Sequence, residues 1–95
     1  MEWQALAMVE VDFKKKALSE ENIRLLEESF RGWADIGNLI IHNKKMTFYL
    51  WGQSKIDYRV LDDLKEKLKS LGYVAFEITA KEYVEKGVTY HYPGV

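Results

Sequence analysis

Apolar and polar residues alternate near the start of the chain. Val9, Val11 and Phe13 fall on one side of this pattern, because successive side chains of a β-strand point to opposite faces of a sheet. The segment from Trp3 to Phe13 is therefore predicted to be a strand with one apolar face. Three lysines at positions 14–16 end the alternation and predict a solvated loop.

Two later segments repeat apolar residues every three or four positions, which is typical of amphipathic helices. The first is expected to begin after Ser19, a good N-cap residue, and Glu20 and Glu21 suit the positive end of the helix dipole. Its apolar stripe consists of Ile23, Leu26, Phe30 and Trp33. Gly32 or Gly37 is expected to end this helix, since glycine is favoured just after a helix.

The second helix is expected to begin with a capping box formed by Ser54 and Asp57. Its apolar stripe consists of Leu61, Leu64, Leu68 and Leu71. Lys67 and Lys69 lie in the last turn, where cations suit the helix dipole. Gly72 is expected to adopt the left-handed conformation that ends many helices.

Three further strands are predicted. Two apolar runs, at 39–42 and 46–51, indicate a β-hairpin. A two-residue turn at 43–44 gathers the large apolar side chains on one face, whereas a three-residue turn would split that face. The pairs expected from the shorter turn are Ile41 with Met46 and Leu39 with Phe48. The last of these strands runs from Tyr73 to Ile78, and its apolar side consists of Val74, Phe76 and Ile78.

The tail from Thr79 has two interpretations. Thr79 and Glu82 match a capping box, and the apolar spacing that follows favours a short helix over residues 79–86, followed by a strand over 88–92. The alternative is a hairpin with residues 85–87 in its turn, where a glycine at the third position suits the left-handed conformation.

The order of elements is therefore strand, helix, strand, strand, helix, strand and tail. Right-handed crossovers place both helices on one face of an antiparallel sheet, which gives the ferredoxin-like split βαβ arrangement. The first strand then lies beside the third and the fourth. Residues 1–95 are predicted to form a single α+β domain, with residues 79–95 packing on the sheet or extending it.

Composition limits the setting of this domain. Its 95 residues include 14 Lys plus Arg and 15 Asp plus Glu, for a formal net charge of −1, which argues against non-specific binding of duplex phosphate. The absence of cysteine excludes disulfides, thiolate metal sites and a cysteine nucleophile. The chain shows no signal-peptide pattern and no apolar run near the ~20 residues that span a bilayer, so a cytoplasmic protein without a membrane partner is expected.

Catalytic signatures are scarce. The sequence contains no phosphate-binding glycine loop, zinc-protease motif, hydrolase elbow or EF-hand loop, and no cofactor is predicted. Its two histidines are interpreted as ordinary structural positions, with His42 solvated at the end of the hairpin and His91 in a strand. These absences favour a protein that is not an enzyme.

Three carboxylates are the exception. Glu10, Asp12 and Glu77 are expected on one face of neighbouring strands, where they could bind a divalent metal or raise one another's pKa. A metal-dependent phosphoesterase would use such a cluster. The favoured interpretation is that lysines of the 14–16 loop or Lys81 neutralise these carboxylates, because charged sheet faces usually carry cross-strand pairs.

The sheet face opposite the helices is expected to be apolar. The predicted binding residues on this face are Leu6, Met8, Ile40, Tyr49 and Trp51. The aromatic tail adds Tyr83, Tyr90 and Tyr92. A solvated face of an antiparallel sheet is normally polar, so this surface indicates an interface. We therefore expect a small non-enzymatic interaction or regulatory module that binds a partner protein or itself as a homo-oligomer.

A single-stranded RNA- or DNA-binding domain is the alternative. In that hypothesis Tyr49 and Trp51 stack on bases, which contributes ~1–3 kcal/mol per base. Lys44, Lys45 and the lysines at 14–16 would contact phosphates.

Overall fold

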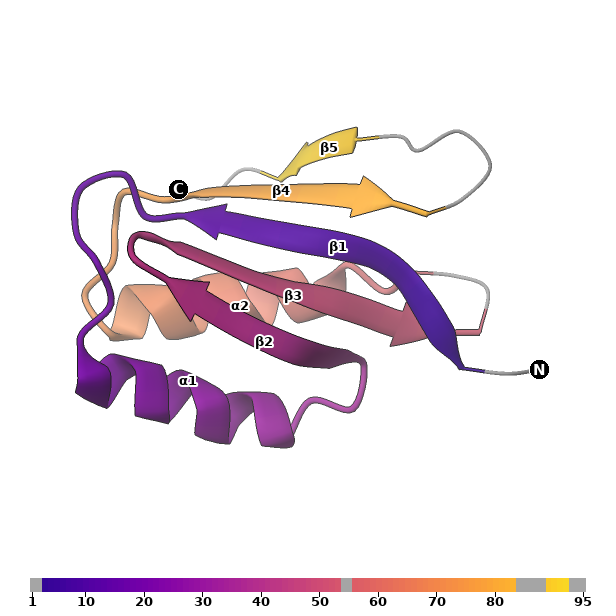
Figure 1. The fold of residues 1–95 in the computed structure, drawn as a ribbon, viewed down its shortest axis with the longest axis horizontal. Helices are drawn as coiled ribbons and strands as arrows, with labels where there is room; N and C mark the ends of the chain where they lie inside the picture. Colours follow the sequence, from indigo (N-terminus) through magenta and orange to yellow (C-terminus); the bar gives the residue numbers. More distant parts are fainter. Residues whose placement is uncertain (1–2, 54–55, 84–88, 93–95) are drawn as a thin grey trace.

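The computed structural model describes residues 3–53, 56–83 and 89–92, the last four by their backbone only. The elements are β1 Gln4–Asp12, α1 Glu20–Arg31, β2 Ile36–His42, β3 Lys45–Gly52, α2 Arg59–Ser70, β4 Glu77–Glu82 and β5 Thr89–Tyr92. The strands form one antiparallel sheet in the order β2-β3-β1-β4-β5, and both helices lie on one face of it (Figure 1). The predicted α+β class is confirmed, and the βαββαβ order is consistent with a ferredoxin-like fold.

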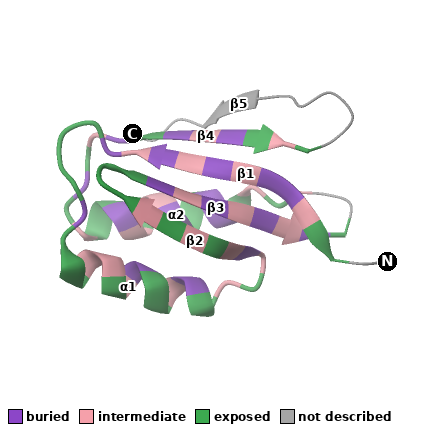
Figure 2. Ribbon diagram, viewed as in Figure 1, coloured by how far each residue is buried: buried purple, intermediate pink, exposed green. Residues whose placement is uncertain are grey.

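β1 lies between β3 and β4, as predicted, and supplies the centre of the core. Val9 and Val11 are completely buried and Phe13 is 1% exposed, so the predicted apolar face of this strand points toward the helices (Figure 2). Phe48 on β3 is also fully buried and meets Phe30 of α1 edge to face, with ring centroids 5.1 Å apart. Burial of each such side chain stabilises the fold by about 1.5–3 kcal/mol.

α1 begins and ends as its sequence indicates. The Ser19 hydroxyl accepts a hydrogen bond from the backbone N–H of Asn22 at 3.2 Å, which confirms the predicted N-cap. Gly32, and not Gly37, ends the helix. Leu26 and Phe30 of the predicted stripe are buried.

α2 begins later than predicted, and the proposed capping box is wrong. The helix starts at Arg59, and Tyr58 occupies the N-cap position without a side-chain cap bond. The Asp57 carboxylate instead accepts a hydrogen bond from the backbone N–H of Arg59, two residues on, at 3.0 Å. Such a local turn competes with helix formation, while Ser54 lies outside the described residues. At the other end Gly72 has φ +93°, as predicted.

The hairpin of β2 and β3 has the predicted two-residue turn and a longer first strand than predicted. Ile41 pairs with Met46, as predicted, and Asn43 in the turn has φ +60°. The pairing register then shifts between Gly37 and Ile40, so Leu39 lies in the irregular stretch and the predicted pair of Leu39 with Phe48 is not part of the regular ladder, although Leu39 packs against the core. A β-bulge in β2 is the physical reason, because residues 38 and 39 together oppose the single residue 48.

The segment before β4 was also predicted incorrectly. β4 begins at Glu77, and Val74, predicted to face the core, is 67% exposed. Tyr73 is buried instead, where its ring lies 5.2 Å from that of Phe13 and its hydroxyl accepts a hydrogen bond from the Asn22 amide at 3.0 Å. Residues 73–76 connect the helix layer to the sheet. The contacts of Tyr73 with Phe13 and Asn22 turn the Tyr73 side chain inward and leave Val74 outside.

The tail is a strand where a helix was favoured. Residues 77–82 form β4, which pairs with β1 on one side and β5 on the other, as in the alternative hairpin. Ile78 and Ala80 are fully buried, so the alternation of a strand determines which side chains enter the core. A helix here would also leave one edge of β1 without backbone partners. The predicted turn at 85–87 lies outside the described residues.

Gly72 provides a test of this fold. A Cβ at this position would meet nothing nearer than the Lys16 ammonium at 3.9 Å, so a substitution is strained by conformation and not by contact. We expect Gly72→Ala to lower the free energy of unfolding by about 1 kcal/mol, because φ +93° disfavours side chains. Urea unfolding should show a lower midpoint at an unchanged slope.

Gly32→Ala is the matched control. Gly32 also follows a helix but has φ −86°, which any residue adopts, and a new Cβ there would lie 3.4 Å from the Ser29 carbonyl oxygen. Its stability should stay level or rise slightly. An equal loss in both variants would contradict the assignment of the cost to the left-handed conformation.

Candidate interaction face

The sheet face away from the helices carries a group of large side chains at the end where β1 begins. We call Met8, Tyr49, Trp51 and Tyr83 the outer patch. Met8 is the cross-strand partner of Tyr49, and Ala5 is that of Trp51. Tyr83 joins them because its backbone N–H donates to the Leu6 carbonyl at 2.8 Å, and the ring centroids of Tyr49 and Tyr83 are 6.3 Å apart. Tyr83 is 51% exposed and the other three side chains are half-buried.

Trp51 is held in a fixed orientation by the bulge in β2. Its indole N–H donates to the side-chain oxygen of Asn38 at 3.2 Å. The ring also lies against Gly37, where a Cβ would be 3.4 Å from the indole nitrogen. Asn38 adopts φ +59°, which asparagine tolerates better than most residues. Sequence reasoning missed both residues, although an adjacent glycine and asparagine are typical of left-handed backbone.

The other predicted binding residues are dispersed. Leu6 is only 4% exposed and lies outside the helix-side core, so it offers little area to a partner. Ile40 is 62% exposed, but it lies on the edge strand opposite Thr47, toward the charged end of the face. The backbones of Tyr90 and Tyr92 pair with residues 80 and 78 of β4, and their side chains are not described.

The opposite end of this face is charged. Asp12 and Glu77 are direct cross-strand partners, and Lys14 bridges them with its ammonium 4.0 Å from Asp12 and 3.9 Å from Glu77. Lys45 pairs with Glu10 at 3.2 Å. The lysine loop thus contacts the carboxylates as predicted, and Lys45, not Lys81, is the partner of Glu10.

These ion pairs bear on the predicted chemistry. Exposed pairs of this kind contribute about 0–1 kcal/mol each, so they act chiefly by balancing charge. Across the part of the chain that the structure describes, no three His, Cys, Asp or Glu side chains are arranged to hold a metal ion.

His42 is exposed at the end of β2, as expected. No helix among the described residues is long and apolar enough to cross a membrane.

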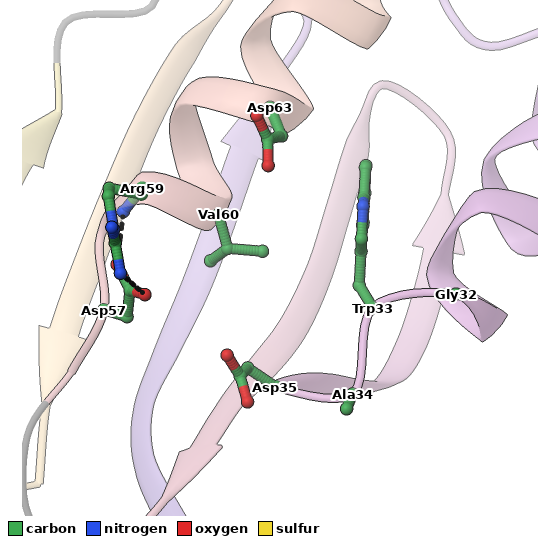
Figure 3. Close-up of a pocket in the computed structure, with 8 residues that line it drawn as sticks. All are labelled: Gly32, Trp33, Ala34, Asp35, Asp57, Arg59, Val60 and Asp63. Carbon is green, nitrogen blue, oxygen red and sulfur yellow. Dashed lines mark hydrogen bonds and ion pairs between the residues drawn. The ribbon is translucent and has the colours of Figure 1, made fainter.

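A groove of about 470 Å³ lies between the α1–β2 connection and the start of α2 (Figure 3). Its lining residues are Gly32, Trp33, Ala34, Asp35, Asp57, Arg59, Val60 and Asp63. Arg59 donates two side-chain hydrogen bonds to the Asp57 carboxylate, at 3.0 and 2.9 Å, and these lower the pKa of Asp57. Trp33 forms the opposite side of the groove, with Val60 between them (Figure 3). Three aspartates against one arginine leave the groove acidic.

Comparisons of the sequence with protein-family models and curated proteins, and of the structure with solved structures, give no match. Function must therefore be inferred from the geometry and chemistry of the described residues. The outer patch brings three aromatic side chains and a methionine together on one face, with Tyr83 exposed and the other three half-buried.

The contact between Asn38 and Trp51 can be tested with two variants. Asn38→Gly removes the hydrogen bond but keeps the left-handed backbone, so it should cost less than about 1 kcal/mol of unfolding free energy. Asn38→Ala removes the bond and adds a strained φ, so it should cost about 1–2 kcal/mol more. In both variants the indole N–H resonance of Trp51 should shift. Equal stabilities would show that backbone strain is unimportant here.

Tyr83 gives a pH-dependent signal. Partial burial raises the pKa of the Tyr83 hydroxyl, and the nearby Tyr49 phenol raises it further. The pKa of Tyr83 is therefore higher in the folded protein than its value near 10 in the unfolded chain. The contribution of Tyr83 to the free energy of unfolding is fully present below pH 10 and is lost as the pH rises through the folded pKa. We expect Tyr49→Phe to lower the pKa of Tyr83 toward its usual value in an NMR titration of labelled tyrosines. An unchanged pKa would show that the two phenols do not interact.

Proposed function

We propose that this chain is a small non-enzymatic interaction module that binds a second copy of itself through the outer face of its sheet. The observation that carries this proposal is the outer patch, on a face that neither α1 nor α2 covers (Figure 1). Aromatic residues and methionine are enriched in the centres of protein interfaces. Trp51 is also held by Asn38, so little side-chain entropy would be lost when it is covered.

Charge balance supports a second copy as the partner. The outer face carries three carboxylates and three lysines, namely Glu10, Asp12, Glu77, Lys14, Lys45 and Lys81. A neutral face gives no steering toward a highly charged partner. In a two-fold contact the same surface serves both partners, and a face with both signs of charge can complement itself.

The size of the face is adequate for such a contact. Five strands spaced by about 4.8 Å, with a length of about 24 Å, give a projected area of roughly 600 Å². Each partner in a standard interface buries about 800 Å² of accessible surface, which exceeds projected area because side chains protrude. A sheet-to-sheet contact over the whole face therefore approaches the size of a stable interface.

Binding of single-stranded nucleic acid is the second candidate. Tyr49 and Trp51 would supply stacking surfaces, but the lysines proposed to contact phosphates lie at the other end of the face. Trp51 lies six positions after Lys45 along β3, a distance of about 20 Å. Lys14 and Lys45 are also paired with carboxylates, so their charge is partly offset.

A phosphoesterase site at Glu10, Asp12 and Glu77 is the remaining candidate, and the lysine pairs of these carboxylates count against it. We also propose that the sheet order represents a ferredoxin-like fold, in which one sheet face is free for assembly. The cytoplasmic location stays a prediction.

Sedimentation equilibrium of Tyr83→Glu tests the proposed contact. The wild-type chain should show concentration-dependent dimerisation, and a carboxylate in the patch should weaken it at least about tenfold, because a buried unpaired charge is costly. Tyr83 is 51% exposed, so the variant should fold. Ile40→Glu should also weaken dimerisation if the contact extends over the whole face.

Val74→Glu is the matched control, because Val74 is 67% exposed but precedes β4 at the other end of the molecule. It should dimerise like the wild type. A wild-type chain that stays monomeric at all concentrations would contradict the proposal, as would equal weakening by Val74→Glu. Salt-sensitive quenching of tryptophan fluorescence by an oligonucleotide would instead support the nucleic-acid candidate.

A further inference from the structure

A basic surface lies at the end of the molecule opposite the outer patch. The end of β1, the β2–β3 turn, the end of α2 and the entry into β4 meet there (Figure 1). The backbone N–H of Phe13 donates to the Lys44 carbonyl at 2.8 Å, which joins the turn to the lysine loop. The Lys16 ammonium lies 4.9 Å from the centre of the Tyr73 ring, beside the end of α2. The lysines brought together in this way are Lys14, Lys15, Lys16, Lys44 and Lys69.

Most of these lysines have no acidic partner. Lys14 is the exception, since its ammonium bridges Asp12 and Glu77. Within residues 3–53 and 56–83 the other four form no ion pair. This end therefore carries four lysines without a salt-bridge partner among the described residues, although the whole chain has a formal net charge of −1. Lys14 also belongs to the outer face, but the other four lysines do not.

The lysines border an apolar slot between the loop at 14–16 and the segment at 72–75. The slot has a volume of about 130 Å³, and its lining residues are Phe13, Lys15, Lys16, Gly72, Tyr73, Val74 and Ala75. A water molecule takes about 30 Å³ in the liquid, so the slot has room for about four waters or one aliphatic side chain. Lys16 is held over the Tyr73 ring by a cation–π contact, which fixes one positive charge at the slot.

We propose that this slot binds an acidic peptide segment, with one aliphatic side chain inside it and neighbouring carboxylates on Lys15 and Lys16. The apolar lining fits the side chain, and the positive rim complements the carboxylates. A membrane surface would be met by several protruding apolar side chains, whereas Val74, 67% exposed, is the one large apolar side chain exposed among the residues that line the slot. Single-stranded nucleic acid would need an exposed ring for stacking, but Tyr73 is only 3% exposed.

Fluorescence anisotropy with a labelled pentapeptide tests this site. The probe is N-acetylated and C-amidated, with a leucine between two pairs of glutamates. The wild-type chain should bind it, and added salt should weaken binding. Lys15→Glu should weaken binding at least about tenfold, while Lys81→Glu, the same charge change at an exposed position on the outer face, should have much less effect.

A third variant tests the slot itself. Ala75→Leu fills it without a change in charge and should also weaken binding at least about tenfold. Val74→Glu places a carboxylate at the rim and gives the same test if Ala75→Leu does not fold. Absence of binding by the wild type, equal effects of Lys15→Glu and Lys81→Glu, or no effect of the slot variants would each overturn the proposal. The proposal would also be overturned by a second result: an oligonucleotide or an anionic vesicle binds in a way that depends on Lys15 but is unchanged in the slot variants.

Discussion

The pairing of β1 along both of its edges holds the rest of the structure in place. β1 pairs with β3 and with β4, and its inward side chains Val9 and Val11 are completely inaccessible to solvent. A shift of one residue would turn both valines and Phe13 outward, so the registers of three strands are fixed together. The outer patch lies where this strand begins, and the basic slot lies where it ends. One strand thus sets the separation of the two surfaces.

Much of the fold could be predicted because local signals agreed with long-range packing. The alternation in β1, the cap at Ser19 and the left-handed Gly72 each have one favourable structural solution. The predictions failed where distant contacts decided the outcome. Tyr73 is buried because its ring packs against Phe13 and its hydroxyl accepts a hydrogen bond from Asn22. No sequence pattern near Tyr73 indicates either contact. The tail has helical spacing, but the unpaired edge of β1 makes it a strand.

The same division applies to the candidate surfaces. Alternation along two strands correctly placed Met8, Tyr49 and Trp51 on the outer face. It could not show that Asn38 would hold the Trp51 indole, because that contact depends on a bulge thirteen residues earlier in the chain. The basic slot was not predicted at all. Its two walls are separated by more than fifty residues, and only the tertiary fold brings them together.

The bulge in β2 also has a consequence for the edge of the sheet. An exposed edge strand with a regular backbone can pair with the edge of another molecule and seed a growing fibre. In β2, the left-handed Asn38 interrupts the regular pairing with β3. A strand of another molecule could therefore pair only with the short regular stretch from Ile40 to His42. The residue that holds the Trp51 indole therefore also impedes strand-by-strand growth along this edge of the sheet.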